Sequence, residues 1–64
     1  MKIFEIKIMT GGLLNVTVAI YQKECADVDA AITEARRSIE NLKSDYHEQL
    51  FYQVFEILQV VETT

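Results

Sequence analysis

The chain has 64 residues, half of them hydrophobic, and its ten acidic and six basic side chains give a formal net charge of −4. A single domain of this size buries only about 60% of the surface that its unfolded form exposes, and one cysteine cannot form an internal disulfide. The acidic balance, with scattered basic residues, argues against direct nucleic-acid binding, which normally needs a basic patch. We therefore expect one small domain over residues 1–64 that self-associates or binds a partner.

Residues 3–10 and 14–22 are predicted to form a β-hairpin. In the first segment Phe4, Ile6 and Ile8 alternate with a more polar set. In the second segment the larger apolar set consists of Leu14, Val16, Val18 and Ile20. Gly11–Gly12 lies between them, where glycine suits a tight reversal because it accepts a positive φ without steric cost.

The alternation also predicts the register of the hairpin. A two-residue loop would set Ile8 against Asn15 and mix the two faces. An odd loop such as Gly11-Gly12-Leu13 keeps the apolar sets together, and it pairs Ile8 with Val16, Ile6 with Val18 and Phe4 with Ile20. We therefore expect the odd loop.

Residues 27–43 are predicted to form an amphipathic helix. Its apolar stripe consists of Val28, Ala31, Ile32, Ala35, Ile39 and Leu42. Asp27 is the best N-cap candidate, and Asp29 adds negative charge to the first turn, where the helix dipole favours it. Charged residues on the other face have the spacing of ion pairs, in Glu34–Arg37, Arg36–Glu40 and Glu40–Lys43. Neither Gly nor Pro lies between Lys43 and Leu50, so the end of the helix stays open in this range.

Residues 51–61 are dense in Phe, Tyr, Val and Ile and are predicted to form a third strand. Both faces of this strand are largely apolar, as expected for a strand covered on both sides. A helical alternative survives through Leu50, Val54, Leu58 and Val61, which share a helix face.

Together these elements predict an α+β fold of the order β-β-α-β. The expected architecture is a three-stranded antiparallel sheet in the order 2-1-3, with one helix packed on one face. The other face is expected to carry Ile3, Met9, Ala19 and Tyr21 with one apolar set of the last strand. Exposed patches of this kind mark interaction sites, so we expect a homodimer.

No pattern in the sequence indicates catalysis, a cofactor or a metal site. Cys25 and His47 stand at opposite ends of the predicted helix, about 25 Å apart at 1.5 Å per residue, which excludes a Cys–His dyad. Gly11–Gly12 lacks the helix start and the Lys-Ser/Thr of a phosphate loop. Asp27 and Asp29 are better explained by helix capping than by calcium binding. We expect a protein that is not an enzyme.

The hydrophobic segments predict neither a membrane span nor a signal peptide. The apolar runs are far shorter than the roughly 20 residues of a spanning helix, and an alternating strand follows Met1 directly. A lone cysteine fits a reducing compartment. We expect a cytoplasmic protein that does not bind membranes.

In its proportions the chain resembles a loose class of very short, acidic β-β-α-β proteins encoded by bacteriophages. The resemblance covers the segments 3–10, 14–22 and 51–61 and the helix start Ala26-Asp27-Val28-Asp29-Ala30-Ala31. Members of this class block a host enzyme such as RNA polymerase, or a defence complex, as anti-CRISPR and anti-restriction proteins do. The resemblance implies an inhibitor that acts by protein–protein interaction in the host cytoplasm. A dimeric antitoxin-like or regulatory module and an orphan structural domain remain as alternatives, because the same skeleton occurs in them.

For an inhibitor, the acidity predicts a host protein with a basic surface, since opposite charge speeds encounter and buried apolar contacts hold the complex. Acidic side chains gather at both ends of the predicted helix, with Asp45 and Glu48 at its end. The group at its start lies beside an aromatic residue with a polar tip, which suits an interface. We therefore predict four partner-binding residues: Tyr21, Glu24, Asp27 and Asp29. The alternative is that Asp27 and Asp29 serve only the helix.

Overall fold

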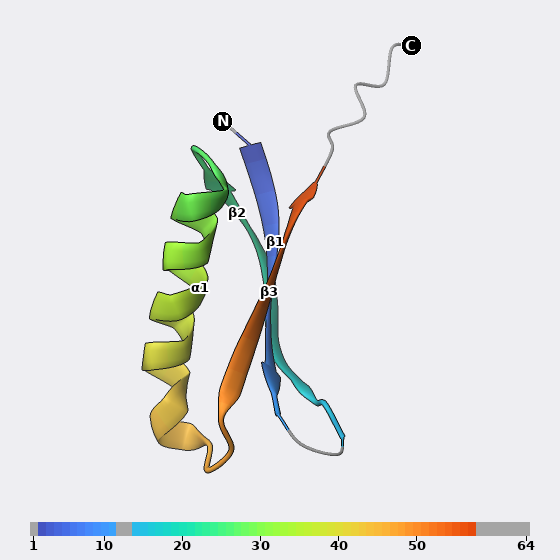
Figure 1. Ribbon diagram of the computed structural model, residues 1–64, viewed down its shortest axis with the longest axis vertical. Helices are drawn as coiled ribbons and strands as arrows, with labels where there is room; N and C mark the ends of the chain where they lie inside the picture. The colour runs from blue at the N-terminus through green and yellow to red at the C-terminus, as the bar shows by residue number, and fades with distance from the viewer. Residues whose placement is uncertain (1, 12–13, 58–64) are drawn as a thin grey trace.

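The computed structural model describes residues 2–11 and 14–57, which form one antiparallel sheet and one long helix. The elements are β1 (Lys2–Thr10), β2 (Thr17–Cys25), α1 (Val28–Leu42), the 3₁₀ turn η1 (Lys43–Asp45) and β3 (Leu50–Ile57). The strand order is β2-β1-β3, and β1 is antiparallel to both neighbours. The helix α1 runs along one face of the sheet (Figure 1). The predicted β-β-α-β fold is confirmed; residues 58–61 of the expected third strand lie outside the described residues.

The central strand β1 supplies the largest buried side chains. Phe4, Ile6 and Ile8 point toward α1 and are at most 1% exposed. Their alternation with half-buried residues is the pattern of a strand covered on one face only. Hydrophobic burial on this one strand therefore holds the sheet to the helix.

The helix begins where its N-cap predicts. Asp27 has extended backbone angles, and its side-chain Oδ1 accepts a hydrogen bond of 2.9 Å from the Ala30 backbone N–H. The helix ends at Leu42 and tightens into η1, after which Tyr46 is extended. This places the helix end near the start of the range that the sequence left open.

Small residues seat α1 on the sheet. Ala31 and Ala35 are fully buried, and Ile39 and Leu42 pack beside them on the core. Two members of the predicted stripe behave differently. Val28 is half exposed, and Ile32 is half-buried but does not pack on either buried cluster of the described residues. The stripe is therefore centred on the two alanines, which let the helix approach the sheet closely.

The predicted hairpin register is wrong. Ile8 pairs with Ala19, Ile6 with Tyr21 and Phe4 with Lys23, a shift of three residues from the expected pairing. Because side chains alternate, an odd shift turns β2 over. Ala19 and Tyr21 now face the helix, and Ile20 faces away. A β-bulge between Ile8 and Met9 adds Val18 to the core side.

The chain reaches this register through a longer connection than the Gly11-Gly12-Leu13 loop. Val16 still bonds to the end of β1: its carbonyl accepts from the Thr10 N–H at 2.9 Å, and its own N–H donates to Thr10 Oγ1 at 3.2 Å. The strand β2 therefore starts only at Thr17. Positions 12–13 themselves lie outside the described residues.

The third strand is covered by the helix on one face. Leu50 is buried and Tyr52 and Val54 are half-buried on the side of α1, whereas Phe51 and Phe55 are exposed on the other side. The helical alternative for this segment is wrong over Leu50–Ile57. The expectation of a strand covered on both sides is also wrong for the part of β3 that the structure describes.

Candidate functional site

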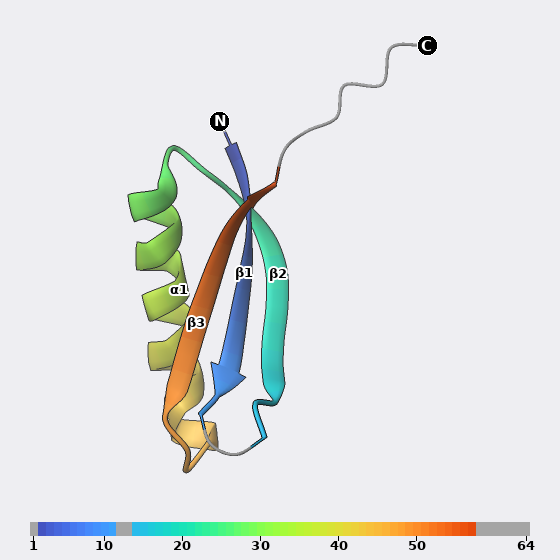
Figure 2. The ribbon, with the colours of Figure 1, turned by 45° about the vertical axis from the view of Figure 1, so that its right-hand side comes forward.

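The sheet has one face without a helix, and we call it the open sheet face. It consists of the β1 side chains that alternate with the buried ones, together with their cross-strand partners. In Figure 2 the three strands lie side by side, with α1 on one side of them. Its apolar members are Ile3, Met9, Ile20, Phe51, Phe55 and Ile57, and its polar members are Glu5, Lys7, Thr17, Gln22, Glu24 and Gln53.

Large apolar side chains on this face stay in contact with water. Phe51 is 46% exposed, Phe55 51% and Ile20 56%. Proteins rarely leave aromatic side chains this exposed on one face of a sheet unless the surface binds something. The open sheet face is therefore the candidate binding surface of the described chain.

Two opposite charges occupy the middle of the open sheet face. Glu5 and Lys7 are half-buried on the central strand, between Ile3 and Met9 at its two ends. The cross-strand neighbours of Glu5 are Gln22 and Phe55, and those of Lys7 are Ile20 and Gln53. Ion pairs in the described structure involve Lys2, Lys23 and Lys43, and none of them includes Glu5 or Lys7.

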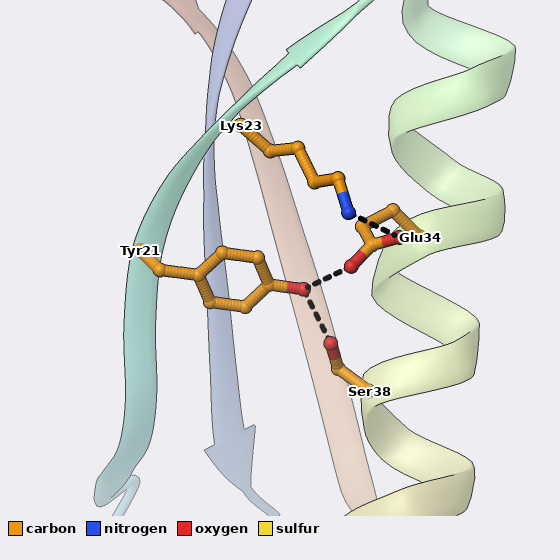
Figure 3. A network of polar contacts seen from close by, with 4 residues as sticks. All are labelled: Tyr21, Lys23, Glu34 and Ser38. Atoms are coloured by element: carbon orange, nitrogen blue, oxygen red, sulfur yellow. Dashed lines mark hydrogen bonds and ion pairs between the residues drawn. The ribbon is translucent and has the colours of Figure 1, made fainter.

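On the opposite side of the sheet, a polar network joins β2 to α1 (Figure 3). The Tyr21 hydroxyl donates to Glu34 Oε1 at 3.3 Å and also bonds to Ser38 Oγ. Because a phenol has a single proton, the Ser38 hydroxyl is the donor in the second bond. Lys23 Nζ lies 3.4 Å from the second carboxylate oxygen of Glu34. Two β2 residues therefore bind one helical carboxylate.

This network changes two expectations about the helix surface. Glu34 was expected on a solvated face in a pair with Arg37, but its side chain is only 19% exposed and pairs with Lys23. Of the three expected pairs along the helix, Glu40–Lys43 is present, with 2.8 Å between Glu40 Oε2 and Lys43 Nζ. The register accounts for the difference, because it brings Tyr21 and Lys23 to the helix side.

The four predicted partner-binding residues do not form one surface. Tyr21 directs its hydroxyl into the β2–α1 network, whereas Glu24 lies on the open sheet face beside Ile3. Asp27 caps the helix, and the Asp29 carbonyl accepts a bond of 3.0 Å from Thr33 Oγ1. Glu24, Asp27 and Asp29 are exposed near the end of β2 and the start of α1. Their role in binding stays a prediction.

The sequence indicated the open sheet face only in part. Ile3, Met9 and one apolar set of the last strand were expected there, and the structure places them there. Ala19 and Tyr21 were expected there and lie on the helix side instead, while Ile20 was missed. The sequence did not determine the register of the hairpin, because either alternating set of β2 side chains is apolar enough to face the helix.

The remaining chemically distinctive residues are placed apart. Cys25 is buried with Phe4 and Ala31, and His47 is exposed beyond the helix end. The 15 residues of α1 separate the two by about 22 Å along the helix axis. Within residues 2–11 and 14–57, no three His, Cys, Asp or Glu side chains lie close enough together to hold a metal ion.

A shallow depression of about 460 Å³ lies between the β1–β2 connection and the segment after η1. Its walls are mainly apolar and include Thr10, Leu14, Val16, Val18 and Tyr46. It borders the positions 12–13 that the structure does not describe, and we assign no ligand to it.

Comparison with protein-family models, with curated proteins and with solved structures found no significant match. None of the helices in the described part of the chain is long and apolar enough to cross a membrane.

Proposed function

We propose that the chain is a non-enzymatic protein–protein interaction module and that the open sheet face is its binding surface. The observation that carries the proposal is the pair of exposed phenylalanines, Phe51 and Phe55, on a sheet face without a helix. Burying about half of a Phe side chain removes on the order of 100 Å² of apolar surface from water, worth about 2 kcal/mol. Two such anchors on β3, with Ile20 on β2 across the central strand, can hold a protein partner.

We further propose that this interaction inhibits a host enzyme or a defence complex, as the resemblance to small acidic bacteriophage proteins implies. It would act in the host cytoplasm and dock on a basic surface. The net charge of −4 supports this choice, because an acidic protein is attracted to a basic target and repelled by an acidic one. Glu24, Asp27 and Asp29 are exposed together near the helix start and can steer such an encounter.

A photo-crosslinking experiment tests the binding surface. Benzoylphenylalanine replaces Phe55 on the open sheet face in one variant and Arg36 on the exposed side of α1 in a control variant. We expect position 55 to crosslink to a partner protein after irradiation and position 36 not to do so. Crosslinking of equal yield at the two positions, or none at position 55, contradicts the proposal.

Substitutions then measure the contribution of the surface to affinity. With the crosslinked partner purified, we expect Phe55→Gln to raise the Kd at least about tenfold. The matched control is Ala30→Gln, which also places an amide at an exposed apolar position, here on α1; it should leave the Kd within about twofold. Circular dichroism spectra of both variants check that the fold is unchanged.

Charge reversal tests the basic target. Glu24 and Asp29 are exposed, and neither is the N-cap, so Glu24→Lys with Asp29→Lys should leave the fold intact. We expect association with the target to slow markedly and to lose most of its dependence on salt. Unchanged association rates would exclude these two acidic side chains from the contact and leave the apolar part of the open sheet face as the binding surface.

A dimeric antitoxin-like or regulatory module is the second candidate. The observation that favours it is the arrangement of charges on the open sheet face, where one acid and one base flank the middle of the central strand. When two copies of such a surface meet, the acid of each copy can pair with the base of the other.

A further inference from the structure

The open face of the central strand has a symmetric sequence of side-chain types. From one end to the other it presents Ile3, Glu5, Lys7 and Met9, that is, apolar, acidic, basic and apolar. The midpoint of this pattern is Ile6, whose own side chain points to the helix. Consider a half-turn about an axis that passes this midpoint, perpendicular to the strand and parallel to the plane of the sheet. Along the strand, this rotation brings Glu5 to the position of Lys7 and Ile3 to the position of Met9.

The neighbouring strand β3 follows the same symmetry at its ends. Ile57 lies beside Ile3, and Phe51 lies beside Met9. The half-turn therefore exchanges two apolar corners of the open sheet face, each built from two side chains. A surface with this property can bind a copy of itself, because the contacts of a two-fold interface are made twice.

We infer that, in the absence of another partner, the open sheet face binds a second copy of this chain, face to face and with the two β1 strands antiparallel. This rests on the proposed function, in which the same face binds protein. The two-fold axis lies between the sheets, perpendicular to the strands, and passes Ile6. Glu5 of each copy then faces Lys7 of the other, and Ile3 faces Met9.

The charges select this arrangement over the other two-fold stacking. With the axis parallel to the strands, Glu5 would face Glu5 and Lys7 would face Lys7, and like charges that meet across an interface are strongly unfavourable. The antiparallel arrangement pairs both charges and also places Phe51 opposite Ile57. Sheets stacked in this way lie about 10 Å apart with their strands within about 30° of each other, which suits aromatic and long side chains.

The size of the face limits the strength of the dimer. Three strands about 4.8 Å apart, each of eight or nine residues, cover roughly 14 by 26 Å. With the relief of the side chains this gives on the order of 500 Å² per copy, or about 1,000 Å² in the dimer, at the lower limit for a specific interface. We therefore expect a dimer that dissociates in the micromolar range, weak enough to give way to a target on the same face.

Sedimentation velocity between about 1 and 500 µM tests the inference, since a small interface dissociates across this range. The full chain should sediment as a 7.4 kDa monomer at the low end and at twice that mass at the high end. Lys7→Glu should raise the dimer Kd at least about tenfold, because each dimer then has two Glu–Glu contacts. Its control is Arg36→Glu, which makes the same change of charge on the exposed side of α1 and should have little effect.

Complementary variants separate charge pairing from misfolding. Glu5→Lys alone should also weaken the dimer, but an equimolar mixture of Glu5→Lys and Lys7→Glu chains should form mixed dimers, because every charged contact is then Lys against Glu. The chain with both substitutions should dimerise within about threefold of the original, which a folding defect would not allow. In the stacking with parallel strands, Lys7→Glu would exchange one repulsive contact for another and leave the Kd nearly unchanged.

The outcomes distinguish this inference from the proposed function. A chain that sediments at 7.4 kDa throughout overturns the dimer, and crosslinking of another protein by benzoylphenylalanine at position 55 would still support the proposed function. If the dimer Kd is unchanged by both Lys7→Glu and Glu5→Lys, the face-to-face arrangement is overturned. The dimer would then form through another surface, such as the edges of two strands. A monomer without crosslinks at position 55 contradicts both.

Discussion

Replacing Tyr21 by Phe removes only the hydroxyl that links β2 to α1. This hydroxyl bonds to Ser38 Oγ and, at 3.3 Å, to Glu34 Oε1. A typical intramolecular hydrogen bond contributes about 0.5–1.5 kcal/mol, and the longer of these two belongs at the low end. We expect Tyr21→Phe to lower the free energy of unfolding by about 1–2 kcal/mol, a substantial part of the roughly 3–10 kcal/mol typical of 64 residues.

Urea unfolding followed by circular dichroism measures this loss. The matched control is Tyr52→Phe, because Tyr52 is also half-buried on the helix side but its hydroxyl makes no hydrogen bond within the described residues; this variant should stay within about 0.5 kcal/mol of the original. A double-mutant cycle of Tyr21→Phe with Ser38→Ala should give a coupling energy of about 0.5–1.5 kcal/mol.

Equal effects of the two Tyr→Phe substitutions, or a coupling energy near zero, would refute the role of the network in the fold. The same variant also tests the sequence-based prediction that Tyr21 binds a partner. If its hydroxyl contacted the target directly, Tyr21→Phe would weaken binding without lowering stability. We expect the reverse, since the hydroxyl already has two partners on α1.

Three further predictions concern the helix and the hairpin, all measured by urea unfolding. Asp27→Ala should cost about 1 kcal/mol through the lost N-cap; no loss would mean that the cap is replaced by solvent. Ile39→Ala should cost about 2–4 kcal/mol and Ile32→Ala less than half as much, because only Ile39 packs on the buried core; equal losses would contradict that packing. Gly11→Ala should cost about 1 kcal/mol, because the added Cβ would overlap the ring of Phe51, and the loss should vanish when Phe51 is also replaced by Ala.

Glycine is needed at position 11 because of a contact with a distant strand. From the sequence, we assigned Gly11 and Gly12 to a turn because glycine tolerates a positive φ. At Gly11 the structure gives another reason, the close approach of the Phe51 ring from β3. The contact joins segments 40 residues apart, so no local pattern could have indicated it.

The sequence by itself determined the features that depend on neighbouring residues. The alternation in β1, the 3.6-residue period of α1 and the Asp27 N-cap each depend on side chains within a few positions of one another. These local preferences, with short connections, were sufficient to predict the strand order β2-β1-β3.

Only the tertiary structure decided which face of β2 turns inward. Counting apolar residues favoured Val18 and Ile20 over Ala19 and Tyr21, and the observed register reverses that choice for Ile20 and Tyr21. The reversed register lets Tyr21 and Lys23 bind Glu34 and buries Cys25 against the core. These contacts with α1 form only when the helix lies on the sheet. The hydrophobic alternation of a single strand cannot predict them, because it contains no information about contacts with other elements.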